Sequence, residues 1–209
     1  LLPFKAGGGQ TIAFGYEGIV YCADQGVDVI NCSWGGPGGG QSGQDAITYA
    51  TINQDALVVC AAGNDNDQDN NFPSGFDYAL SVAATELSDI KSSYSSYGYT
   101  VDVCAPGTIW ATYDGGGYGS MSGTSMASPV AAGSAALVKS QNSWMNALQV
   151  GEQLKITADD IYALNSGYVD MLGTGRINLA NALGSVTQPS IDMSDKVVTD
   201  NADDAFVIG

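Results

Sequence analysis

The stretch Leu-Val-Val-Cys-Ala-Ala-Gly-Asn at residues 57–64 decides the fold class of this 209-residue chain. Its first five residues are a continuous apolar run, which is typical of a strand buried on both faces of a parallel sheet. Gly63 and Asn64 follow where the run ends, and both residue types are common in turns. Because open α/β sheets bind ligands beyond the carboxyl ends of their strands, Asn64 is a candidate site residue as well as a plain turn residue.

Helices and strands are predicted to alternate around this strand. The expected helices cover residues 11–25, 42–53, 125–140, 148–156 and 178–183, and the expected strands cover residues 27–32, 57–61, 80–85, 101–105, 108–112 and 118–121. Ser42 is the expected cap of the second helix. The helix at 125–140 consists almost entirely of small or apolar residues, which predicts burial on all sides. This order predicts an α/β layered domain with right-handed crossovers.

The composition excludes several classes of protein. The hydrophobic fraction of 44% and the length suit a soluble globular domain with a substantial core. The 22 acidic residues against 6 basic ones give a net charge of −16, which would repel nucleic acid and anionic lipid. No apolar run approaches the length of a membrane span. Phosphate-binding patterns such as GxxxxGK[ST], or GxGxxG after a strand, are absent, which disfavours a nucleotide-binding domain.

The four cysteines are expected to be buried thiols. Three of them, Cys32, Cys60 and Cys104, lie in apolar runs, where a thiol acts as a small hydrophobic group. No C-x-x-C pair occurs and the chain has no histidine, so a zinc site is not expected.

The most specific motif is Gly-Thr-Ser-Met-Ala-Ser-Pro at residues 123–129. Its serine, Ser125, begins the predicted small-residue helix, where free N–H groups and the helix dipole stabilise nearby negative charge. A lone serine there would be explained as an N-cap. The whole heptapeptide, however, resembles the nucleophile motif of the subtilisin-like serine peptidases, the subtilases.

Further segments resemble the same family in order along the chain. They are Phe72-Pro73-Ser74 with the strand after it, the stretch from Tyr94 through Ala105-Pro106-Gly107, and the glycine-rich run at residues 172–178. The resemblance extends from about Leu1 to about Leu183. It implies the C-terminal part of a three-layer α/β subtilisin-like fold with a mostly parallel sheet, incomplete at its N-terminal side. The expected domain is residues 1–185, and residues 186–209 are expected to be a linker, a tail or the start of a further domain.

The resemblance also implies roles for site residues. Ser125 is the expected nucleophile, and Asn64 with the Ser125 backbone N–H is expected to stabilise the oxyanion. The walls of the pocket for the substrate side chain before the scissile bond are expected from two short segments: Ser33, Trp34 and Gly35 on one side, and Ala61, Ala62 and Gly63 on the other. Trp34 departs from the usual aliphatic residue, and core packing is its alternative role.

The general base of the family's mechanism is missing from the chain. The family uses a histidine oriented by an aspartate, and both motifs precede the part that this chain resembles. The resemblance therefore implies a secreted serine endopeptidase acting on peptides or proteins, with His and Asp supplied by residues outside the chain or by a companion chain. The alternative is a catalytically inert peptide-binding fragment or pseudoenzyme. The isolated chain is expected to be inactive and to expose an uncovered sheet edge.

No cofactor is expected to take part in the chemistry. Many subtilases bind structural calcium, and the loop acids Asp65, Asp67 and Asp69 are candidate ligands. The same acids are also typical of any solvated loop, and no EF-hand spacing is present. No residue is assigned as a metal ligand.

Overall fold

The computed structural model of the protein describes residues 1–8, 11–68, 70–113 and 115–184. The helices are α1 (Gly15–Asp24), α2 (Gly40–Thr48), α3 (Thr124–Gln141), α4 (Ala147–Ile156) and α5 (Leu179–Gly184), with a π-helical turn at Tyr49–Asn53 and 3₁₀ turns at Tyr162–Leu164 and Ser166–Tyr168. The strands are β1 (Gly7–Gly8), β2 (Thr11–Ile12), β3 (Val29–Cys32), β4 (Leu57–Ala61), β5 (Ala79–Thr85), β6 (Val103–Pro106), β7 (Thr108–Tyr113) and β8 (Gly117–Ser122). The segment expected to be a linker, a tail or the start of a further domain, residues 186–209, lies outside the described residues.

The central sheet consists of four parallel strands in the order β3-β4-β5-β6. Each strand pairs with the strand that comes next in the sequence, and Cys32 of β3 lies beside Cys60 of β4. Parallel neighbours need crossover connections, and the α2 and π-helical segments lie between β3 and β4 in the chain. The predicted parallel α/β sheet is thus confirmed.

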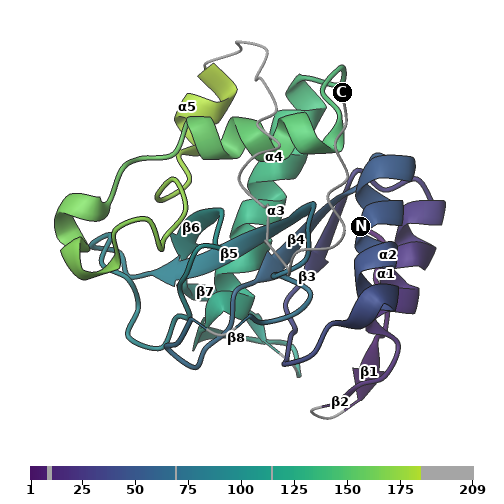
Figure 1. The fold of residues 1–209 in the computed structure, drawn as a ribbon, viewed down its shortest axis with the longest axis horizontal. Helices are drawn as coiled ribbons and strands as arrows, with labels where there is room; N and C mark the ends of the chain where they lie inside the picture. Colours follow the sequence, from purple (N-terminus) through teal and green to yellow (C-terminus); the bar gives the residue numbers. More distant parts are fainter. Residues whose placement is uncertain (9–10, 69, 114, 185–209) are drawn as a thin grey trace, which may run out of the picture.

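Alternating side chains of β4 pack into two different cores. Leu57 and Val59 face the core that α3 and α4 cover, whereas Val58 and Cys60 face the core that α1 and α2 cover. Every residue of β4 is buried, as the apolar run predicts. Figure 1 shows α1 and α2 side by side on one side of the sheet and α3 crossing on the other. The result is the expected three-layer arrangement, helix, sheet and helix.

Two helix boundaries differ from the sequence prediction. The first helix begins at Gly15 rather than residue 11, because Thr11 and Ile12 instead pair with Gly7 and Gly8 in a short antiparallel ribbon. The second helix begins at Gly40, and its N-cap position is Gly39, so the prediction of Ser42 as the cap is wrong. Gly40, the last residue of the glycine-rich stretch at residues 35–40, is therefore the first residue of α2.

Helix α3 is not buried on all sides, contrary to the sequence prediction. Its core side includes Ala127, Ala131 and Ala135, but Leu137 on another side is 49% exposed. Pro129, Ala132, Gly133 and Ala136 of α3 line an open hollow of about 1280 Å³ together with residues 1–4 and the strand β3. β3 is an edge strand of the four-stranded sheet. The hollow therefore lies beside an unpaired sheet edge and an uncovered side of α3.

The four cysteines are buried thiols, as predicted, and none forms a disulfide. Burial raises the pKa of the Cys104 thiol to about 12, with the nearby Lys91 ammonium opposing that rise. A thiol with such a pKa stays protonated at neutral pH and is a poor nucleophile.

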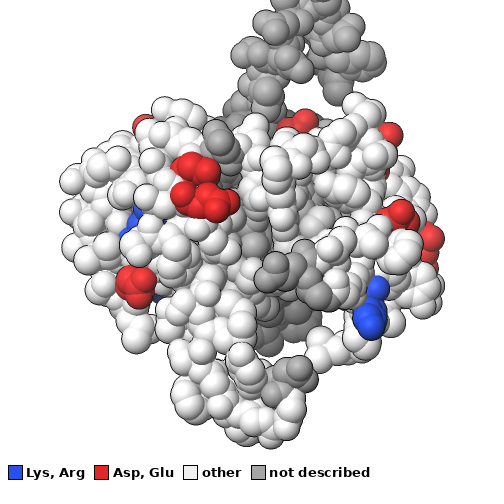
Figure 2. Space-filling view, turned by 90° about the horizontal axis from the view of Figure 1, so that it is seen from below, with Lys and Arg blue, Asp and Glu red and all other residues white. Residues whose placement is uncertain are grey.

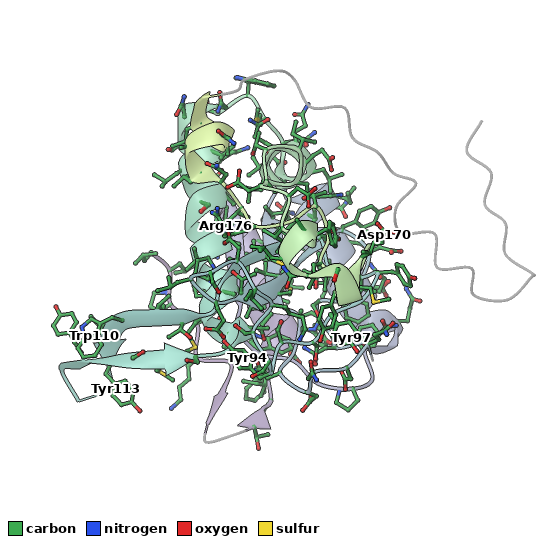
Figure 3. The ribbon with its side chains drawn as sticks, turned by 90° about the vertical axis from the view of Figure 1, so that its left-hand side faces the viewer. Tyr94, Tyr97, Trp110, Tyr113, Asp170 and Arg176 are labelled. Carbon is green, nitrogen blue, oxygen red and sulfur yellow. The ribbon has the colours of Figure 1, made fainter. Side chains whose placement is uncertain are left out.

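A two-stranded hairpin, β7 with β8, leads the chain into α3. Figure 3 shows it projecting from the body of the molecule, with Trp110 and Tyr113 pointing away from it on opposite sides. At its base the Gly123 N–H donates to the Gly107 carbonyl at 2.9 Å. The hairpin therefore fixes the direction in which the chain enters α3.

Basic side chains in the described part of the chain are used largely in ion pairs. Arg176 binds Asp89 at 2.6 Å and Asp159 at 2.7 Å, and Lys139 binds Asp55 at 3.1 Å. On the face drawn in Figure 2, acidic side chains form separate patches among few basic groups. No helix of the described residues is both long and apolar enough to cross a lipid bilayer.

Candidate active site

Ser125 is the second residue of α3 and is half-buried. The residue before the helix, Gly123, has φ 157° and ψ 163°, a region that is essentially restricted to glycine. This turn places the Ser125 backbone N–H in the first turn of the helix, where it has no partner within the helix. The positive end of the helix dipole is at the same place. A negative charge that develops beside Ser125 would therefore be stabilised.

Asn64 lies beside the start of α3, and Thr124 fixes its orientation. The backbone N–H and the hydroxyl of Thr124 both donate to Asn64 Oδ1, at 2.8 and 3.1 Å. Because Oδ1 accepts both bonds, the Nδ2 amide remains as a donor toward the open side of the site. The same Thr124 hydroxyl accepts a hydrogen bond from the Gly63 N–H at 3.2 Å.

The loop backbone at Gly63 also requires glycine. Its φ is 115°, and a Cβ atom placed there would lie 3.0 Å from the Ser96 hydroxyl. Gly63 therefore allows the end of β4 to turn sharply and carry Asn64 to the start of α3.

A chain of polar contacts joins β3 to α3 beneath Ser125. Ser128 donates to Asn31 Oδ1 at 2.7 Å, Asn31 Nδ2 donates to the Ser33 hydroxyl at 2.9 Å, and that hydroxyl donates to the Ser125 carbonyl at 2.8 Å. In return, the Ser125 hydroxyl donates to the Ser33 carbonyl at 3.1 Å. These contacts hold the first turn of α3 against the end of β3.

A pocket of about 530 Å³ opens next to Ser125 and Asn64. Of the residues expected to form its walls, Trp34, Gly35, Ala61 and Gly63 line it, together with six further polar residues: Asp65, Asp67, Asn70, Asn71, Ser96 and Thr124. Ser33 and Ala62 are outside the lining. Ser33 instead binds the Ser125 backbone, and Ala62 packs into a separate core cluster.

Trp34 has two roles in the structure. It lines the pocket and also packs edge-on against Tyr16, with ring centroids 5.5 Å apart. Trp34 therefore has both of the roles that the sequence leaves open, lining the pocket and packing in the core.

The profile of the subtilase family matches residues 2–197 of the sequence. The chain belongs to the subtilase family. Thermitase of Thermoactinomyces vulgaris is 43% identical over 168 residues, and subtilisin Savinase of Lederbergia lenta is 35% identical over 175 residues. These alignments cover 80% and 83% of this chain but only 58% and 62% of the two relatives.

Solved structures of proteases share the fold of this subtilase. A protease of Pseudoalteromonas arctica PAMC 21717 superimposes with a TM-score of 0.73 at 30% identity, over 81% of this chain and 57% of the other. The self-cleaved protease domain of PatA gives 0.72 at 27% identity, over 80% of this chain and 65% of the other. The subtilase chain thus spans about three fifths of the length of the proteins that it matches.

Two of the three acids considered as calcium ligands, Asp65 and Asp67, lie in the described part of the subtilase. Among the described residues, no group of three His, Cys, Asp or Glu side chains gathers around a common point. Asp67 accepts a hydrogen bond from Ser96 at 3.0 Å, Asp65 is exposed, and Asp69 lies outside the described residues.

Thr124 positions Asn64 through two hydrogen bonds, which the motif at residues 123–129 does not indicate. We expect Thr124→Val to lower kcat about tenfold in the complete subtilase, because one hydrogen bond to Asn64 and the partner of the Gly63 N–H are both lost. KM should change less than kcat. Steady-state kinetics on a peptide amide measures both constants. Thr124→Ser keeps the hydroxyl and should retain most activity, so equal losses in the two variants would contradict the assignment.

The buried Lys91 side chain binds the loop that carries Asn64. It is only 5% exposed, and its ammonium donates to Asn66 Oδ1 at 2.8 Å and to the carbonyls of Ser92 and Ser95 at 3.0 and 2.7 Å. The rings of Tyr97 and Tyr168 lie 5.1 and 4.9 Å from the ammonium, within cation–π range. Burial lowers the pKa of the Lys91 ammonium, and Cys104 opposes this only in part.

This lowered pKa makes the stability depend on pH in a defined direction. The unfolded chain keeps the Lys91 proton up to about pH 10.4, whereas the folded protein releases it at lower pH. Between the two pKa values the unfolded state binds more protons, so the free energy of unfolding rises with pH. Below the folded pKa both states are protonated, and the contribution is constant.

We therefore expect the free energy of unfolding of the protein with Lys91 to rise relative to that of Lys91→Met as the pH rises toward about 10.4. Urea unfolding at a series of pH values measures it, and the Ser125→Ala background prevents self-digestion. Taking the difference between the two proteins cancels the contributions that do not depend on residue 91. A difference that stays flat or falls over this range would contradict the effect.

Proposed function

We propose that this chain provides the nucleophile, the oxyanion hole and the substrate pocket of a serine endopeptidase. The observation that carries the proposal is the geometry around the start of α3. The Ser125 hydroxyl lies there beside its own free N–H, and Thr124 turns the Asn64 amide donor toward the same space. Two donors that converge beside a nucleophile form the arrangement that acyl transfer requires.

The reaction follows from these groups. The Ser125 Oγ attacks the carbonyl carbon of the scissile peptide bond as its proton passes to a general base, and the carbonyl oxygen becomes an oxyanion. Asn64 Nδ2–H and the Ser125 N–H donate hydrogen bonds to that oxyanion. Collapse of the tetrahedral intermediate breaks the C–N bond, and the amine leaves with a proton from the base. Water then hydrolyses the ester on Ser125 and restores the hydroxyl.

The general base must come from residues outside this chain, because the 209 residues include no histidine. The hollow between β3 and α3 supports this proposal. The lining of this hollow is mostly apolar, and β3 is an unpaired edge strand of the described sheet. The hollow lies beside β3, and Ser33, which follows β3, donates to the Ser125 carbonyl. A segment bearing His and Asp, in the same polypeptide or in a companion chain, would cover the apolar lining of this hollow.

In the structure the Ser125 proton is donated to the Ser33 carbonyl at 3.1 Å. An incoming histidine nitrogen would have to replace this acceptor before Ser125 becomes nucleophilic. Without a base the pocket remains able to bind a peptide, which is the basis of the alternative proposal, an inert peptide-binding fragment or pseudoenzyme.

No cofactor is proposed for the reaction, and the site for the substrate is proposed to take peptides or unfolded proteins. Secretion is proposed from the acidic surface and from the family.

A fluorophosphonate probe tests the proposal directly. The probe reacts with a serine only where a base and an oxyanion hole activate it. Intact mass measurement of every polypeptide in the natural sample, followed by peptide mapping, should find the label on Ser125 and a histidine-bearing segment in the same sample. An unlabelled chain found without such a segment would leave only the inert alternative.

A further inference from the structure

The pocket beside Ser125 has a negatively charged wall. Asp65 and Asp67 line it, and none of the described residues of its lining is Lys or Arg. Neither carboxylate has an ion-pair partner among the residues that the structure describes. We refer to Asp65 and Asp67 together as the acidic wall.

The acidic wall is held in place by Ser96. The Ser96 hydroxyl donates to Asp67 Oδ1 at 3.0 Å and accepts from the Asp65 backbone N–H at 3.3 Å. This single hydroxyl therefore fixes the backbone of one acid and one carboxylate oxygen of the other. The remaining carboxylate oxygens keep their lone pairs for a donor that enters the pocket.

The rest of the pocket suits a long side chain with a polar end. Trp34, Ala61 and Gly63 provide an apolar or small surface, along which an aliphatic stem can lie. Asn71 donates its Nδ2 to the Ala61 carbonyl at 3.1 Å, which leaves its Oδ1 as a further acceptor in the lining. A lysine or arginine side chain has this combination of an apolar stem and a head made only of donors.

We infer that this pocket takes a lysine or arginine side chain at P1, the substrate residue whose carbonyl Ser125 attacks. The inference rests on the proposed peptidase function and adds the substrate class. A neutral aromatic or aliphatic P1 side chain would leave the two carboxylates with nothing to neutralise them. The net charge of −16 would also raise the local concentration of cationic substrates.

A matched pair of substrates tests the inference in the complete protein. Two peptides that differ only by arginine or citrulline at P1 have nearly the same shape and differ by one positive charge. Partly exposed ion pairs each change an equilibrium by about a factor of two to five. We therefore expect kcat/KM for arginine to exceed that for citrulline by about tenfold at low ionic strength, and the ratio to shrink in high salt.

Asp65→Asn/Asp67→Asn should reduce the arginine-to-citrulline ratio to about twofold or less. Asparagine at position 67 can still accept from Ser96, so the loop keeps that hydrogen bond. The control is Asp45→Asn on α2, where an exposed acid outside the pocket lining is replaced. It removes one negative charge, as each of the two substitutions in the acidic wall does. It should leave the ratio unchanged.

Several results would overturn the inference. They are a ratio near one in the unaltered protein, a ratio that survives removal of the acidic wall, or an equal fall in Asp45→Asn. The single variant Asp65→Asn tests the ratio without disturbing the loop, because the Asp65 side chain is exposed and makes no described contact. Failure of the proposed function itself would appear differently, as no hydrolysis of either peptide and no fluorophosphonate label on Ser125.

Discussion

In the complete protein, Ser125→Ala is expected to lower kcat for peptide hydrolysis on the order of 10⁶-fold, the size of the loss known from subtilisin itself. The physical reason is that alanine removes the atom that forms the acyl-enzyme bond. The pocket and the Asn64 donor remain, so peptide binding should be retained and the residual rate should still exceed the rate in water. Steady-state kinetics with a labelled peptide amide, together with equilibrium binding of the same peptide, measures both quantities.

The control for this variant is Ser42→Ala. Ser42 is an exposed serine of α2 that lines neither the pocket beside Ser125 nor the hollow between β3 and α3. Loss of its hydroxyl should leave kcat within about twofold, as for most surface substitutions. If Ser125→Ala retained full activity while fluorophosphonate labelled another serine, the assignment of the nucleophile would be wrong.

Removal of the Asn64 amide is expected to have the second largest effect. Asn64→Ala should lower kcat by about 10²–10³-fold with little change in KM, a magnitude that also comes from the corresponding donor in subtilisin. The donor acts on the oxyanion, which exists only in the transition state and the intermediate. An interaction made only there lowers kcat without weakening substrate binding.

Asn64→Asp separates this role from a merely structural one. Aspartate keeps the Oδ1 atom that accepts from Thr124 at 2.8 and 3.1 Å but replaces the Nδ2 donor by an acceptor. We expect its kcat to fall at least as far as that of Asn64→Ala, because a carboxylate would also repel the oxyanion. Near-normal turnover by Asn64→Asp would mean that the residue only positions Thr124. Asn53→Ala, an exposed asparagine at the end of the π-helical turn, is the matched control.

The sheet and its strands could be predicted from the sequence because their signals are local. The run at residues 57–61 is apolar throughout and became β4 with the predicted bounds. The expected burial of α3 on all sides was wrong because the composition of a helix does not show which neighbours are present. In the described part of the chain, Pro129, Gly133 and Ala136 line the open hollow beside β3 and are not covered by a packed element.

The contacts around the candidate site were only partly predictable. Ser125 and Asn64 lie in motifs that are recognisable in the sequence, but the contact between Thr124 and Asn64 joins residues 60 positions apart. Lys91 gave no signal at all, since a lone lysine in a polar segment is typical of an exposed surface. Ser128 lies in the motif at residues 123–129, and Asn31 comes two residues before the predicted wall residue Ser33, but neither segment alone indicates the hydrogen bond between them.

The strand order β3-β4-β5-β6 follows the order of synthesis, which has a consequence for how the protein is made. As the chain leaves the ribosome, each new strand can join an edge that has already formed, so no strand waits for one that is still untranslated. Helix α3 comes after all four strands and packs on every one of them. Helix α3, which carries Ser125, therefore leaves the ribosome after all four strands that it packs on, so these strands are available when the helix docks.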